Sequence, residues 1–298
     1  MDRTEVLKEI QNNVALLSRV DAPEYKYIPL HQKPSPSVVR IQSLMNLLRS
    51  VIFPGFFDDV QEIRKESLPY YLGVYLEQIY DLLHEQIYYG LCFEKDDCAC
   101  SMKQKASDMA MAFINRIPHV KYLLSTDVKA ILDGDPAAKS VSEIILSGYF
   151  SHVAPTGSDE LYVQGIPVLP RIITEMAHSQ TGIDIHPGAC IGEYFSMDHG
   201  TGIVIGQTAI IGNHVRLYQG VTLGAKSFTL DDEGLPMDVP RHPIIEDDVT
   251  IYSNASVLGR ITIGKGSIIG GNIWLTHSVP PGSKIVQSRV VEDNFHAL

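Results

Sequence analysis

The sequence predicts an α + β protein: an N-terminal all-helical domain over residues 1–181, followed by a C-terminal left-handed parallel β-helix over residues 182–298. Three observations predict this fold. Apolar residues in the first part recur at helical spacing, whereas after Gly182 an aliphatic residue recurs every six positions. The six-residue rhythm is interrupted twice, and the longer interruption predicts an extruded loop over residues 225–243.

Helical spacing runs through the first domain in separate segments. One helix is marked by Val6, Ile10, Val14 and Leu17. Breaks are predicted at 34–37, 54–55, 93–99 and 133–136, where proline, glycine or charged residues gather. These breaks divide the domain into six or seven helices, the last of which ends near 177–181. The stretch 68–91 is apolar around most of its circumference, which predicts a helix buried between neighbours.

A hexapeptide repeat begins after Gly182. Its apolar positions form three runs: Ile185, Ile191, Met197 and Ile203; Ile205, Ile211, Leu217 and Leu223; Ile245, Ile251, Val257, Ile263, Ile269 and Leu275. Six residues make one short strand and a corner, so three sides close a triangular coil of about 18 residues with the aliphatic side chains inside. Extra residues can only leave such a coil at its corners. The first interruption adds two residues before Ile205, and the second adds about sixteen between Leu223 and Ile245.

The composition argues against several classes of protein. A hydrophobic content of 45% and a charged content of 20% are typical of globular proteins. A net charge of −11 disfavours nucleic acid as a partner. Cys92, Cys98 and Cys100 lack the second pair of ligands that a structural zinc site needs, so we expect reduced thiols and no metal. Neither a signal segment nor an apolar run of about 18 residues occurs, which favours a cytoplasmic protein with no membrane partner.

Each interruption of the repeat carries a histidine. His199 lies in a glycine-rich segment, and His242 follows Arg241 near the end of the longer interruption. Near neutral pH histidine is the natural general base. Asp184 precedes His199 by fifteen positions, close to one coil, so we expect both at one corner, either as a carboxylate–imidazole dyad or as structural corner residues. We also expect the two interruptions to bring His199 and His242 to a shared cleft.

The motifs of the second domain resemble those of the serine acetyltransferases, in the same order. They are Asp184-Ile185-His186-Pro187, Asp198-His199-Gly200-Thr201-Gly202, Gln219-Gly220-Val221-Thr222-Leu223-Gly224 and Arg241-His242-Pro243. The resemblance covers half of the chain, from about Asp133 to Pro281, and before Asp133 it is one of general character. It implies transfer of the acetyl group of acetyl-coenzyme A to the hydroxyl of L-serine, which gives O-acetylserine in the first step of cysteine biosynthesis.

The resemblance also implies a role for each residue of the site. His199 would be the general base and Asp184 its dyad partner. The serine-binding groups would be Asp135, Asp198, Arg241 and His242. This set suits a zwitterion, because carboxylates attract its ammonium and a guanidinium fork receives its carboxylate. The deprotonated hydroxyl attacks the thioester directly, so neither a protein nucleophile nor a metal is needed.

Acetyl-coenzyme A is the implied cosubstrate, in a groove on the outside of the β-helix. By position the residues Gly224, Ala225, Ser253 and Gly271 would line it. The resemblance further implies a homotrimer with its active sites between subunits, paired into hexamers in many relatives. Many relatives also dock a terminal isoleucine into O-acetylserine sulfhydrylase, but this chain ends in Phe295-His296-Ala297-Leu298, which counts against such docking.

The chain also departs from the family within the β-helix. Its loop is longer and acidic over 226–240, and Tyr252 and Trp274 replace small residues, which would reshape the coenzyme groove.

Three other functions fit parts of the sequence. A γ-class carbonic anhydrase shares the prism and binds zinc through histidines, for which His186, His199, His214 and His242 are the candidates. An acetyltransferase for a sugar or an antibiotic would use the same fold, but Asp135 and Arg241 suit an amino acid better. A non-catalytic scaffold would use the prism only to assemble subunits.

Overall fold

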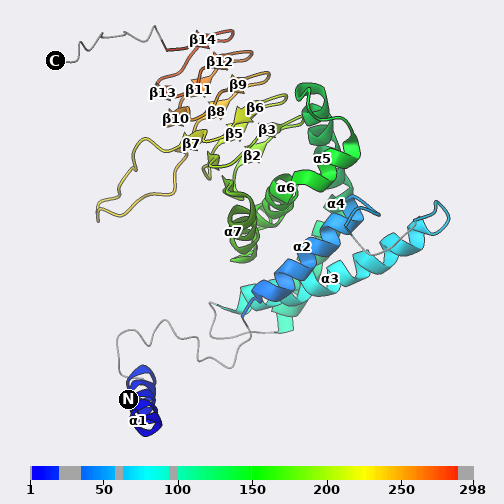
Figure 1. The fold of residues 1–298 in the computed structure, drawn as a ribbon, viewed down its shortest axis with the longest axis vertical. Helices are drawn as coiled ribbons and strands as arrows, with labels where there is room; N and C mark the ends of the chain where they lie inside the picture. The colour runs from blue at the N-terminus through cyan, green and yellow to red at the C-terminus, as the bar shows by residue number, and fades with distance from the viewer. Residues whose placement is uncertain (1, 20–34, 58–62, 94–99, 149, 288–298) are drawn as a thin grey trace. The chain divides into compact units, whose positions relative to one another are not determined.

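The computed structural model describes residues 2–19, 35–57, 63–93, 100–148 and 150–287 (Figure 1). By internal contacts the chain divides into a unit of 1–34 and a unit of 35–298, which we describe separately. The tail on which the sulfhydrylase expectation rests lies outside the described residues, as does Cys98. No helix of the described residues has the length and apolar character needed to cross a membrane.

The first unit contains helix α1, Arg3–Leu17. Asp2 begins it with a capping box, in which its side chain accepts from the backbone of Glu5 and the Glu5 side chain accepts from the backbone of Asp2. The predicted apolar stripe is present, but no residue of α1 is buried.

Six helices of the second unit precede the β-helix. They are α2 Val38–Ile52, α3 Leu68–Phe93, α4 Cys100–Gly134, α5 Val141–Gly148, α6 Phe150–Val163 and α7 Leu169–Thr181. Together with α1 the described residues form seven helices, and the predicted breaks fall between them. Their core includes Ile41, Leu83 and Phe113. Fully buried residues of α3 begin at Ile79, whereas its first turns are only partly buried and Tyr70 is 79% exposed. The expectation of a helix buried between neighbours therefore holds for the second part of α3 and not for its start.

One expectation about the cysteines is also wrong. Cys92, at the end of α3, is disulfide-bonded. The spacing of the cysteines counts against a zinc site but does not exclude a disulfide. Cys190, on the β-helix, is a free thiol.

The β-helix follows α7 directly, as predicted. Its strands are β1 Asp184–Ile185, β2 Cys190–Ile191, β3 Ser196–Asp198, β4 Val204–Ile205, β5 Ile210–Ile211, β6 Arg216–Tyr218, β7 Thr222–Gly224, β8 Ile244–Ile245, β9 Thr250–Ile251, β10 Ser256–Leu258, β11 Thr262–Ile263, β12 Ile268–Ile269, β13 Trp274–Leu275 and β14 Lys284–Ile285. They form three parallel sheets, β1-β4-β7-β10-β13, β2-β5-β8-β11 and β3-β6-β9-β12-β14. The aliphatic residues of the repeat fill the interior.

The strand register confirms both interruptions. Val204 pairs with Thr222, 18 positions on, which is the regular coil. Asp184 pairs with Val204, 20 positions on, so the first coil holds two extra residues. Thr222 pairs with Ser256, 34 positions on, and the extra residues form the loop 225–243, which projects from the column (Figure 1).

Two edges of the prism matter for the site. Edge 1 joins the sheet of β3 to the sheet of β1 and comprises the turns 199–203, 219–221, 252–255 and 270–273. Edge 2 joins the sheet of β1 to the sheet of β2 and comprises the turns 186–189, 206–209 and 259–261 with the loop 225–243.

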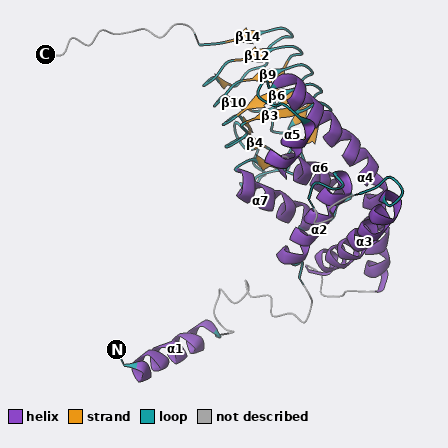
Figure 2. Cartoon of the chain, turned by 45° about the vertical axis from the view of Figure 1, so that its right-hand side comes forward, coloured by secondary structure: helices purple, strands orange, loops and turns teal. Residues whose placement is uncertain are grey.

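Helix α4 is fixed to the first coil by polar contacts. The backbone N–H of Tyr194 donates to Thr126 Oγ1 (3.1 Å), and that of Phe195 donates to Asp127 Oδ1 (3.0 Å). The hydroxyl of Tyr122 donates to Glu193 (3.0 Å). The helices therefore cover the coil-1 end of the column, with the C-terminal end of α4 beside β3 (Figure 2).

His186, on edge 2, should make folding pH-dependent. Burial, reinforced by Arg171 and opposed by Asp184, lowers its pKa to about 4, and Nδ1 accepts a hydrogen bond from Gly188 N (3.0 Å) that protonation would break. Since the folded pKa lies below the unfolded value, the unfolded chain takes up the proton first, and stability is lost as pH falls from about 6.5 toward 4.

We expect the wild type to lose about 1 kcal/mol more unfolding free energy than His186→Gln between pH 7 and pH 5, after allowance for solvent screening. Urea denaturation at the two pH values measures this difference. His277→Gln, a change at an exposed histidine, should keep the wild-type pH dependence. Equal losses in the wild type and His186→Gln would contradict the prediction.

Candidate active site

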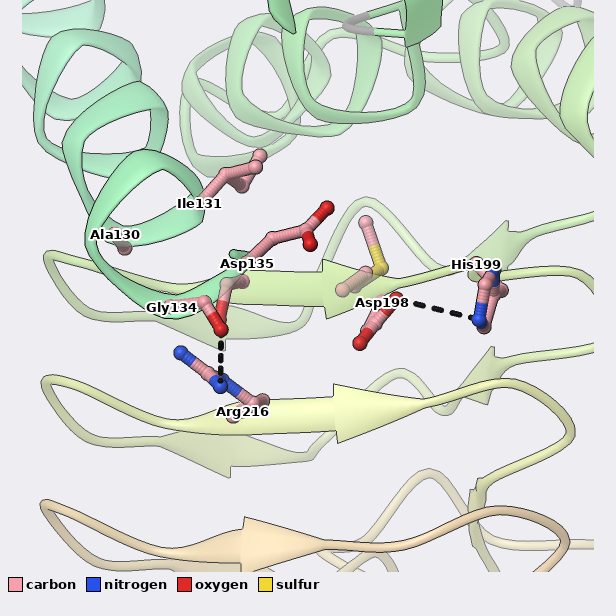
Figure 3. A pocket seen from close by; sticks show the side chains of 9 residues that line it. Ala130, Ile131, Gly134, Asp135, Asp198, His199 and Arg216 are labelled. Atoms are coloured by element: carbon pink, nitrogen blue, oxygen red, sulfur yellow. Dashed lines mark hydrogen bonds and ion pairs between the residues drawn. The ribbon is translucent and has the colours of Figure 1, made fainter. Parts of the chain in front are cut away.

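A pocket of about 200 Å³ lies between the end of α4 and edge 1 (Figure 3). It is lined by Ala130, Ile131, Gly134, Asp135, Ser196, Met197, Asp198, His199 and Arg216. Asp135 follows the last residue of α4, and Asp198 ends β3. The pocket thus brings together three of the predicted residues, Asp135, Asp198 and His199. Its volume is below the range of drug-sized sites, about 300–1,000 Å³, and suits a small polar ligand.

The two extra residues of the first coil expose His199. Its φ is +57°, and Gly200 and Gly202 continue the turn at +75° and +78°, a conformation that glycine adopts without strain. A Cβ at Gly200 would also press on the Ile183 side chain, 2.5 Å away. The imidazole is 73% exposed, with Nε2 3.6 Å from Asp198 Oδ1. A ring held at the rim of a pocket and open to solvent can reach a substrate hydroxyl.

Asp184 starts β1 at the same edge as His199. The backbone N–H of Gly202, in the His199 turn, donates to the carbonyl of Gly182 (2.7 Å), so the turn lies against the start of β1. Within the described residues, however, the carboxylate paired with His199 is Asp198 rather than Asp184. The common corner is therefore present, and the dyad stays a prediction.

Arg241 and His242 lie on edge 2, away from this pocket. The Thr208 hydroxyl accepts from both of their backbone N–H groups (2.9 and 3.1 Å), and Gln207 Oε1 accepts from Arg241 Nη2 (2.7 Å). Gly206 leaves room for the His242 ring, which a Cβ there would overlap. His199 and His242 therefore do not share a cleft within one chain, because the sheet of β1 separates their edges.

The His242 ring is held in a defined state. Burial, with further contributions from Arg241 and Arg260, lowers its pKa, which favours a neutral ring. Nδ1 accepts from Thr208 N (3.1 Å) and faces Thr208 Oγ1 (2.9 Å). The proton of the neutral ring then resides on Nε2, which is available as a donor.

The predicted coenzyme-binding residues are also divided between edge 1 and edge 2. Gly224 and Ala225 lie where the loop leaves edge 2, whereas Ser253 and Gly271 lie on successive turns of edge 1. A Cβ at Gly271 would come within 3.1 Å of the Ser253 carbonyl, so the two turns are closely stacked. Near them Tyr252 stacks on Tyr218, with centroids 4.9 Å apart. On one chain, each edge carries half of the predicted serine site and half of the predicted coenzyme site.

Sequence reasoning missed three polar residues at these places. Arg216 lines the pocket, Thr208 fixes the backbone of Arg241 and His242, and Gln207 fixes the Arg241 guanidinium. All three are side chains that point out from the repeat. Outward positions of a hexapeptide repeat accept many residue types, so only the basic character of Arg216, one coil above Ser196, could have singled it out.

The candidate zinc histidines lie on all three edges. His199 is on edge 1, and His186 and His242 are on edge 2. His214 is on the remaining edge, where it stacks on Tyr194 with centroids 4.5 Å apart. Among the residues that the structure describes, no three metal-binding side chains come together.

Known proteins similar to this chain are serine acetyltransferases. No sequence-family model matches it. "Serine acetyltransferase, plasmid" of Synechococcus elongatus is 44% identical over 99% of this chain and 97% of its own length. The serine acetyltransferase of Bacillus subtilis is 44% identical over 58% of this chain and 77% of its own length. The crystal structure of Entamoeba histolytica serine acetyltransferase 1 in complex with L-cysteine has a TM-score of 0.72 and 34% identity, over 86% of this chain and 90% of that one.

Proposed function

The chain belongs to the serine acetyltransferase family and acetylates the hydroxyl of serine in cysteine biosynthesis, and we propose that its pocket at edge 1 is where this reaction takes place. One observation carries the proposal: Asp135 is distant in sequence from the consecutive residues Asp198 and His199, yet all three line one small pocket. Two carboxylates can receive the ammonium of serine there, while the imidazole lies at the rim.

In the proposed mechanism His199 removes the proton of the serine hydroxyl as its oxygen attacks the acetyl carbonyl of acetyl-coenzyme A. The C–O bond forms, the tetrahedral oxyanion collapses, and the C–S bond breaks to release the coenzyme thiolate, which takes up the proton from the imidazolium. Asp184 would stabilise that imidazolium from the start of β1. No metal takes part in these steps.

We further propose that the working unit is a homotrimer. The proposed base, His199, is on edge 1, and the residues for the serine ammonium line the pocket beside it. Those for the serine carboxylate, Arg241 and His242, are on edge 2. Two edges of one rigid prism cannot meet, but edge 1 of one copy can face edge 2 of the next. Repeated head-to-tail contacts of this kind close into a ring, and a three-sided column suits a ring of three.

The loop 225–243 supports such contacts. Its large apolar side chains are exposed, among them Phe228 (60%), Leu230 (55%) and Leu235 (56%). At its base Arg241 is held by Gln207, so the loop leaves the column at a fixed place. Pairing of trimers into hexamers, and the cytoplasmic location, stay predictions from the sequence.

Release of coenzyme A thiol tests the function. Purified protein with acetyl-coenzyme A and a thiol reagent should release thiol when L-serine is added, and far less with L-homoserine or with a neutral sugar. The selectivity against one extra methylene should be about 10- to 200-fold in kcat/KM. Release that depends on a sugar and not on serine would refute the assignment of the pocket to an amino acid, and no release with any acceptor would favour a scaffold.

A further inference from the structure

Arg216 connects the β-helix to the residue next to Asp135. It begins β6, and its Nη1 donates to the carbonyl of Gly134, the last residue of α4, at 3.0 Å (Figure 3). Its guanidinium also lines the pocket that holds Asp135 and Asp198. The side chain thus joins the second coil to the end of a helix that is distant in sequence.

The end of α4 needs such a donor. The last carbonyls of a helix lack partners within the helix and form the negative end of its dipole. The last turn of α4 contains no basic residue of its own, so the cation comes from the β-helix. Gly134 fits this arrangement, because a Cβ at that position would overlap the guanidinium of Arg216.

The contact governs where Asp135 lies. The backbone N–H of Asp135 donates to Ile131 (2.9 Å), and its Oδ1 accepts from Ala137 N (2.8 Å), so the carboxylate moves with the helix end. On the other side Arg216 pairs in register with Ser196, two positions before Asp198. The side chain of Arg216 therefore links the end of α4, next to Asp135, to β6, the strand that pairs with the strand of Asp198.

We propose that Arg216 is a positioning residue for serine recognition: by holding the end of α4 against the second coil, it sets the spacing of Asp135 and Asp198. The inference rests on the proposed function of the pocket. Asp135 and Asp198 would touch the ammonium of serine, whereas Arg216 acts through Asp135. The binding of serine should therefore depend on Arg216 much more than the chemical step or the binding of acetyl-coenzyme A does.

The kinetic test compares Arg216→Gln, Arg216→Lys and Tyr122→Phe. Arg216→Gln should raise the KM for serine about tenfold, change kcat and the KM for acetyl-coenzyme A less than about twofold, and Arg216→Lys should recover part of the loss. Tyr122→Phe removes another link between α4 and the first coil, the one to Glu193, and should leave all three constants near wild type. Circular dichroism melting confirms that each variant is folded.

An unchanged KM for serine in Arg216→Gln would overturn the proposal. So would an equal rise in Tyr122→Phe, because the effect would then come from general loosening of α4. Hydrogen exchange separates this inference from the proposed function: without any substrate, the amides of residues 131–138 should exchange faster in Arg216→Gln and at the wild-type rate in Tyr122→Phe. Faster exchange in an enzyme inactive toward serine would refute the function only, and unchanged exchange would refute the positioning role.

Discussion

His199→Ala should lower kcat for serine-dependent release of coenzyme A thiol by about 10²- to 10⁴-fold. His199 carries the one imidazole among the residues that line the pocket, and the hydroxyl of serine is a weak nucleophile until a base removes its proton. The KM for serine should change little, because the groups proposed to bind the ammonium and the carboxylate of serine are on other residues. Steady-state kinetics with a thiol reagent measure both constants.

His214→Ala is the matched control for this change. His214 also lies in a turn of the β-helix at positive φ (+57°), but it does not line the pocket and instead stacks on Tyr194. We expect near wild-type kcat from this variant. A loss below tenfold in His199→Ala would show that His199 is a corner residue without a catalytic role, and a comparable loss in His214→Ala would trace the effect to the fold.

Mixing two inactive variants should restore activity if each site is built from two chains. Arg241→Ala should lower activity at low serine concentration by about 10²-fold, because the guanidinium fork that we propose for the serine carboxylate is lost. When His199→Ala and Arg241→Ala subunits assemble at random in equal amounts, about a quarter of the sites pair an intact edge 1 with an intact edge 2. Coexpression with two different affinity tags, followed by purification on both, removes the trimers of a single variant. Each remaining trimer then has one intact site in three, so we expect about a third of the wild-type activity.

The control pair carries both changes on one edge. Asp198 immediately precedes His199, so the two residues belong to the same site. Every site in a mixture of His199→Ala and Asp198→Asn therefore lacks one of them, and activity should stay at the level of the separate variants. Equal recovery in both mixtures would contradict the division of the site between edges. No recovery in the first mixture would mean that Arg241 and His199 do not serve a common site.

The fold of the β-helix could be predicted from the sequence because its six-residue period follows from the geometry of the coil. A buried position recurs every six residues and returns to the same side of the coil after eighteen. Ile205, Leu223 and, once the sixteen extra loop residues are subtracted, Val257 therefore had to lie in one column, as the register shows. The positions of the two interruptions followed from the same six-residue count. What could not be predicted was burial that depends on neighbours: the first turns of α3 are only partly buried, and Tyr70 is 79% exposed.

The candidate site was predictable only in part. His199 and Asp184 lie at edge 1 because their separation is close to one coil. The cleft predicted for His199 and His242, within one subunit or between subunits, does not form within one chain and stays a prediction for the contact between subunits. Counting the phase of the second interruption would have shown that it leaves from edge 2. The contact between Arg216 and Gly134 depends on how α4 docks on the first coil, and the repeat carries no information about that docking.

The stacked turns of edge 1 also set fixed distances along the column. Between the turn of His199 and that of Gly271 lie three coil spacings, about 14 Å at roughly 4.8 Å each. The number of repeats between these turns thus fixes how far the proposed base lies from the distal part of the coenzyme groove. Inserting one further 18-residue coil would leave every strand paired and yet lengthen that span by about 5 Å, a change in reach without a change in any side chain.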